Sequence, residues 1–188
     1  MATIYSVSDS LVAVLSSILY PNGTDNSTPI GNFDIAIFQG WPVPQELDAT
    51  LAAGNAMVSV YPTQIERNVT RGLGEEWSEQ IFPGVSHGIS TKETKRQDRC
   101  FQISIWCATP HQRESLTDLL DSALSNINRL SLADGSTGNM HYSHSFTTDM
   151  LEKENIYRYD LYYNIEFPTT LSAVDPVVIA NTINKTVL

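Results

Sequence analysis

The chain has little charge, and none of it is basic over the first third. Charged residues are only 17% of the 188, with 11 Lys and Arg against 21 Asp and Glu, a formal net charge of −10. The first basic residue is Arg67. Such a chain is not held on DNA or anionic lipid by its whole surface, although it can surround DNA without gripping it.

Long apolar runs and a basic N-terminus are also missing. With no Lys or Arg near Met1, we expect no secretory signal. No segment approaches the roughly 18 apolar residues of a membrane-spanning helix, so we expect no membrane partner.

Cysteine is scarce as well. Cys100 and Cys107 fall in one predicted strand, on opposite faces, with Cα atoms roughly 23 Å apart. A disulfide needs Cα atoms within about 7 Å, so we expect two reduced, packed thiols.

Hydrophobic residues, 41% of the chain, are enough for a core and lie in clear patterns. Helical spacing predicts a helix capped by Ser8 or Asp9 and ending near Tyr20, one over 45–53, and a long one capped by Thr109 with Gln112 completing a capping box. Alternation predicts strands over 33–38, 57–61, 100–108, 140–147 and 157–167. Pro62 and Pro168 are expected to end two of them.

The remaining segments are less regular. Residues 22–32 read as a loop, 63–91 as extended strands or a long hairpin, and the charged segment 92–99 as a turn or strand end. The order predicts an α+β fold, a mainly antiparallel sheet with helices packed on one face, plus extended loops. We expect one domain over residues 1–170 and a C-terminal tail, 171–188, that docks on a neighbouring subunit.

No residue set forms a convincing active site. His141 and His144 with Asp149 resemble a metal constellation, but residues three apart on a strand face opposite sides and converge only on an irregular loop. Cys107 with His111, and Ser86 with His87, lack an orienting group and an oxyanion hole. We therefore expect no catalytic residue, metal or cofactor, with a small cytoplasmic metal- or thiol-dependent enzyme as the alternative.

Interface candidates are easier to find. Lys92, Lys95, Arg96 and Arg99 form a basic cluster interrupted by acidic residues, which favours an acidic patch on an adjacent subunit over nucleic acid. The tail carries an apolar cluster, Val177, Val178 and Ile179. A basic-free N-terminal third and a basic cluster in the middle suit head-to-tail association in a ring.

Several segments together resemble the tail terminator or neck (head–tail joining) proteins of tailed bacteriophages. They are an N-terminal helix before a strand, the sequence AMVSVYP at 56–62, the motif Thr-Pro-x-x-Arg-x-x-Leu at 109–116 opening a long helix, and a Tyr/Phe-rich strand ending in EFPTT at 166–170.

The resemblance implies a structural virion protein, assembled in the host cytoplasm and located at the tail–neck junction. It would form a ring, often a hexamer, that caps the tail tube and joins it to the head connector, with DNA passing through the lumen. Another neck or head-completion adaptor, or a minor tail protein, remains an alternative.

Overall fold

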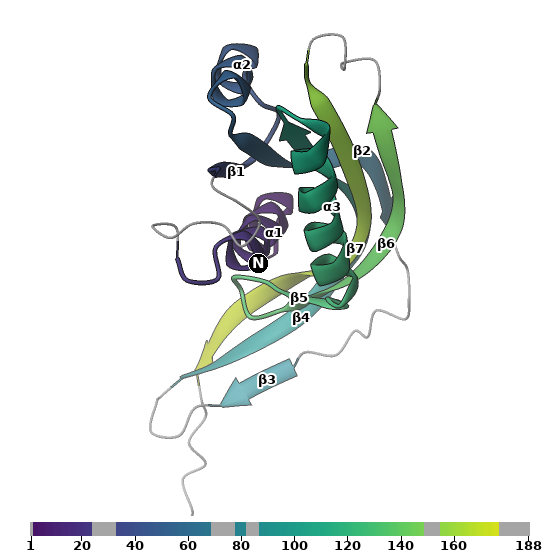
Figure 1. The fold of residues 1–188 in the computed structure, drawn as a ribbon. Coiled ribbons are helices and arrows are strands. Elements are labelled where there is room, and N and C mark those ends of the chain that lie inside the picture. The colour runs from purple at the N-terminus through teal and green to yellow at the C-terminus, as the bar shows by residue number, and fades with distance from the viewer. Residues whose placement is uncertain (1, 24–32, 69–77, 82–86, 149–154, 177–188) are drawn as a thin grey trace, which may run out of the picture.

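The computed structural model describes residues 2–23, 33–68, 78–81, 87–148 and 155–176 (Figure 1). Within them lie three helices and seven strands. In chain order these are α1 (Ile4–Leu19), β1 (Ile35–Gln39), α2 (Pro44–Ala52), β2 (Ala56–Asn68), β3 (Ser78–Ile81), β4 (His87–Cys107), α3 (Pro110–Ser125), β5 (Arg129–Ser131), β6 (Thr137–Thr148) and β7 (Tyr157–Pro176).

All the strands join one sheet, in the order β1-β2-β4-β7-β6-β5, with β3 also paired to β4. Every pair is antiparallel except β1 with β2. The sheet curls around the long helix α3 (Figure 1). The α+β class and the mainly antiparallel sheet are therefore confirmed.

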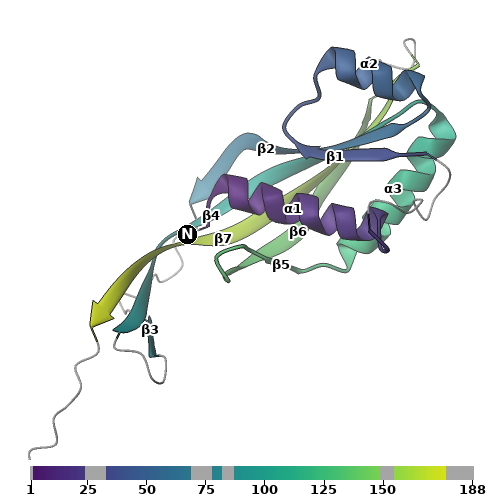
Figure 2. The same ribbon diagram turned by 90° about the vertical axis from the view of Figure 1, so that its left-hand side faces the viewer.

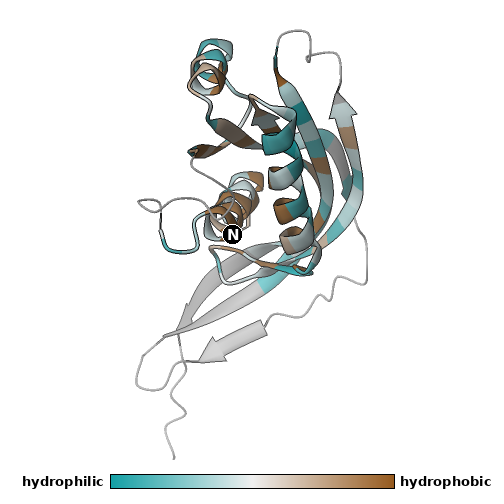
Figure 3. Ribbon diagram, viewed as in Figure 1, coloured by the Kyte–Doolittle hydropathy of each residue, from teal (hydrophilic) through white to brown (hydrophobic). Residues whose placement is uncertain are grey.

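The main core lies between the sheet and the two longer helices, α1 and α3. Alternate residues of β4 and β7 are buried against them, as the sequence alternation predicted, and so are the apolar stripes of both helices. α2 covers the opposite face through a smaller cluster with Met57 and Trp106. Figure 2 shows α2 on one side of the sheet and α1 and α3 on the other, and in Figure 3 hydrophobic and hydrophilic residues alternate along α3.

The helix boundaries follow from their caps. Thr3, with Ser6 in a reciprocal capping box, starts α1 at Ile4, so the expected cap at Ser8 or Asp9 was wrong. Thr109 does cap α3 by accepting from the Gln112 amide. The Gln112 side chain donates instead to the Gly54 carbonyl, which ties α3 to the end of α2.

Two strands pass through the prolines expected to end them. β2 continues past Pro62, and β7 past Pro168. In both places the outer neighbour has just ended: β1 pairs with β2 only as far as Val60, and β6 pairs with β7 only as far as Glu166. A strand with one neighbour tolerates a residue without an N–H donor.

The charged segment 92–99 was expected to be a turn or a strand end. That expectation was wrong, because the segment forms the middle of β4. It pairs with β7 along its length and with the end of β2. Alternation sends its charged side chains to the two faces of the sheet, where they avoid the core. β7 also crosses the expected boundary at residue 170, and residues 177–188 lie outside the described part.

Candidate assembly surface

The most prominent feature of the molecule is an arm, formed by β3 with residues 87–99 of β4 and 166–176 of β7. It projects away from the helices in both ribbon views (Figures 1 and 2). The basic cluster of the sequence lies along it on β4. The three tail residues Val177, Val178 and Ile179 follow the arm but lie outside the described residues.

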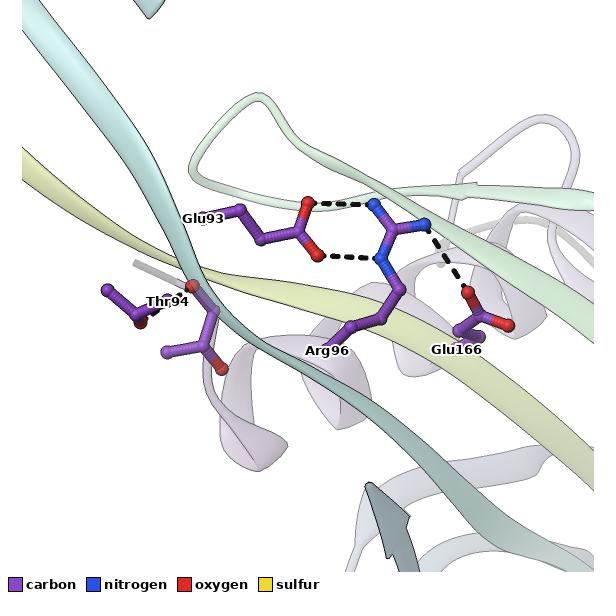
Figure 4. A network of polar contacts seen from close by, with 5 residues as sticks. Glu93, Thr94, Arg96 and Glu166 are labelled. Atoms are coloured by element: carbon purple, nitrogen blue, oxygen red, sulfur yellow. Dashed lines mark hydrogen bonds and ion pairs between the residues drawn. The ribbon is translucent and has the colours of Figure 1, made fainter. Parts of the chain in front are cut away.

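An ion-pair network holds the arm together at Arg96 (Figure 4). Its guanidinium donates to Glu93 through Nε at 2.6 Å and Nη2 at 2.8 Å, and to Glu166 of β7 at 3.3 Å. The register of β4 against β7 shifts between Glu93 and Lys95, because Thr94 forms a bulge. That extra residue turns Glu93 onto the face of Arg96, so side chains three apart meet.

This network changes the electrostatics of the basic cluster. The hydrogen bonds to Glu93 raise the pKa of the Arg96 guanidinium above its ordinary value. Arg99 is also engaged: its Nε donates to the Thr63 carbonyl. It lines an open pocket of about 460 Å³ with Tyr5, whose side chain is 78% exposed. Part of the positive charge of the basic cluster is thus compensated within the chain. The role of this cluster as an interface stays a prediction.

A second charged cluster, which the sequence patterns did not reveal, lies on the opposite face from α1 and α3. Arg158 lies against both Trp41 and Trp106, 4.7 and 4.5 Å from the ring centroids, in the corner that these two perpendicular rings form. It pairs with Asp160, which is only 1% exposed, through Nε to Oδ1 at 2.9 Å and Nη2 to Oδ2 at 2.8 Å. The sequence signal was present: Arg158 and Asp160 share the polar face of a strictly alternating strand.

The two histidines considered for metal binding lie on β6. A second bulge, at Ser143, shifts the register so that His141 and His144 both face the side of the sheet that carries Tyr162. The expectation that they face opposite sides was therefore wrong, because the bulge resets the alternation. His144 stacks on Tyr162, with ring centroids 4.2 Å apart, and both histidines are exposed. Asp149 lies outside the described residues, among which no three metal-ligating side chains come together.

The thiol alternative also has a definite geometry. Cys107 is fully buried in the main core, and burial raises the pKa of its thiol to about 12. His111 lies exposed in the first turn of α3. A buried thiol of this kind is protonated at neutral pH and is not a nucleophile. Ser86, the other candidate nucleophile, falls outside the described residues.

No described helix is long and apolar enough to cross a membrane.

Comparison of the sequence with protein families and with curated proteins finds no match. Comparison of the fold does. A sheath/tube terminator in the extended state, from the extracellular contractile injection system PVC, is similar at a TM-score of 0.53 and 17% identity over 100% of this chain. This chain spans 65% of that protein, less than two thirds of its length. A protein of the native gene transfer agent virion gives a TM-score of 0.39 at 15% identity, over 88% of this chain and 93% of the other.

Proposed function

We propose that the chain is a structural protein that terminates the tube of a phage-type tail. The observation that carries the proposal is the fold likeness to a sheath/tube terminator, which extends over the whole of this chain. The resemblance of residues 56–62, 109–116 and 166–170 to tail terminators points to the same role.

In finer detail, several copies form a ring, a hexamer in the family that the sequence resembles. The ring caps the tail tube and joins it to the head connector, and genomic DNA passes through the lumen without sequence-specific contacts. A net charge of −10 suits such a conduit, because like charges repel phosphate and let DNA slide. The projecting arm, with Lys92 and Lys95 beside the Arg96 network, is a surface for a neighbouring subunit.

The second candidate is a neck or head-completion adaptor with the same fold. It differs from a terminator only in which neighbours it touches, so position in the particle separates the two. A ring between tube and connector is a terminator, whereas a protein bound only to the head vertex is an adaptor.

The test is electron microscopy of particles labelled with an antibody to this chain. Label at the head-proximal end of the tail, and overlong tubes when the chain is removed, are the expected results. Label along the tail or at its distal tip, with tubes of normal length in its absence, would contradict the proposal.

A further inference from the structure

The edge of β6 is open over residues 141–148. β5 pairs only with residues 137–139, and the Met140 amide still bonds to the Asn128 carbonyl. Beyond that point no strand among the described residues pairs with the outer edge of β6. Unpaired N–H and C=O groups along such an edge are a template for another strand.

This edge has few of the devices that usually prevent pairing. Residues 137–148 contain no Pro and no Asp, Glu, Lys or Arg. The bulge at Ser143 is one such device, but His144 to Thr148 run in regular register with β7. Two large apolar side chains stand exposed beside the edge, Tyr142 at 50% on one face of the sheet and Phe146 at 58% on the other.

The other open edges of the described sheet are protected. At β1 the Tyr20 hydroxyl accepts from the Ile35 amide at 2.8 Å and donates to the Ile35 carbonyl at 3.0 Å. β2 beyond β1, and β7 beyond β6, carry Pro62 and Pro168. β3 and β5 are four and three residues long. Among the described strands, residues 141–148 of β6 are the longest open edge without a Pro or a charged residue.

The chain also contains a segment suited to be the added strand. Residues 177–188, VVIANTINKTVL, follow β7, and more than half of them are β-branched. They include no acidic residue and one Lys, and the odd-numbered positions carry Val177, Ile179, Ile183 and Val187. Apolar residues also fall at the even-numbered positions Val178, Ala180 and Leu188, so such a strand would be partly apolar on both faces. Each face can pack against one of the exposed aromatic side chains beside β6, which stand on opposite faces of the sheet.

The length of residues 177–188 determines whether they can pair with β6 of their own chain or only with β6 of another copy. β7 runs eleven residues past Ile165, the partner of Met140, to Pro176, a distance of about 36 Å. Residues 177–188, fully extended, span at most about 43 Å. Turning back along the arm, they arrive at Met140 with one or two residues left, so they cannot cover residues 141–148 of their own chain.

We propose that residues 177–188 of one copy add as a strand to the β6 edge, residues 141–148, of a second copy. The inference rests on the proposed ring and names the contact that builds it. Because tail and edge are different surfaces, the contact is heterologous, and repetition closes a ring when the rotation allows. Main-chain hydrogen bonds supply much of the affinity, as in other complexes built by strand addition.

The experiment measures hydrogen–deuterium exchange of β6 in the full-length chain at increasing concentration, together with sedimentation. A tail variant, Ile179→Pro with Ile183→Pro, removes two donors without changing the length. An edge variant, Thr147→Lys, puts a charge on the open part of β6. Its matched control, Thr137→Lys, makes the same change at an exposed threonine of the same strand where β5 already pairs.

We expect the 144–148 amides to exchange at least about tenfold more slowly once the chain assembles. The tail variant should lose both the protection and the oligomer, and Thr147→Lys should lose the oligomer while Thr137→Lys keeps it. Amides that exchange freely at every concentration, or protection that survives the proline variant, would overturn the inference. An oligomer that forms without protection of β6 would contradict only this contact and would leave the proposed ring standing. The labelling of particles tests the terminator role separately.

Discussion

Replacing Arg158 with methionine should strongly destabilise the domain, although the residue lies away from the main core. Methionine keeps an apolar stem against Trp41 and Trp106 but leaves the Asp160 carboxylate, 1% exposed, without the two hydrogen bonds at 2.8 and 2.9 Å. Breaking a buried pair by removing one partner costs about 3–5 kcal/mol. The loss of two cation–π contacts is a further, smaller cost.

For a chain of this length each kcal/mol shifts the melting temperature by about 2–4 °C, so the variant should melt about 6–20 °C lower. Urea unfolding followed by tryptophan fluorescence gives the free energy directly, at a protein concentration low enough to keep the chain monomeric. Arg129→Met, at an exposed arginine of β5, is the control and should change stability by no more than about 0.5 kcal/mol.

A second substitution tests the cause. Adding Asp160→Asn to Arg158→Met removes the unpaired buried charge, so the double variant should recover more than half of the loss. Arg158→Met costing less than about 1 kcal/mol, or no recovery in the double variant, would refute the reasoning.

Three further predictions follow from other sites. Lys95→Glu with Arg96→Glu should weaken a subunit association that is itself salt-sensitive; association at low salt that the variant leaves unchanged would count against it. Burial raises the pKa of Cys107 to about 12, so as pH rises the thiol loses its proton in the unfolded chain before it does in the folded one. The free energy of unfolding should therefore fall as pH rises above about 9. Urea unfolding at several pH values should show a smaller fall in Cys107→Ala. Tyr20→Phe removes both hydrogen bonds to Ile35, which should cost about 1–3 kcal/mol and open the β1 edge; unchanged unfolding and no new self-association would contradict this.

The sequence correctly predicted those helices and strands that one local residue pattern determines. Strict alternation in 157–167 placed Leu161, Tyr163 and Ile165 in the core, and all three are buried there. Thr109 followed by Pro110 defined the start of α3. These patterns succeed because the face that meets the helices must be apolar, whatever the neighbouring strands do.

The failures on the strands have one physical origin, which is that a single sequence does not show which strands pair. Pro62 and Pro168 end a strand only if both edges are paired, and neither position has an outer neighbour among the described strands. The bulges at Thr94 and Ser143 break the two-residue alternation on which face assignments rest. They bring Glu93 to Arg96 and place His141 and His144 on one face, which counting by twos could not foresee.

The sequence predicted the basic residues of the candidate surface but not their partners. The basic cluster stands out in an acidic chain, but its partners Glu93 and Glu166, one of them 70 residues away, depend on register. The Arg158 site combines residues from β7, β4 and the segment before α2, brought together only when the sheet has formed.

The long pairing of β4 with β7 also has a mechanical consequence. One long ladder, with a bulge at Thr94, runs from Cys107 and Tyr157, beside α3, to His87 and Pro176 at the tip of the arm. A pull on the arm along the strands loads these bonds in shear, many at once, whereas a pull across them would unzip the pairs one by one. A subunit attached through the arm's long axis can therefore transmit tension to the body without its ribbon opening, which suits a part fixed between a rigid tube and whatever adjoins it.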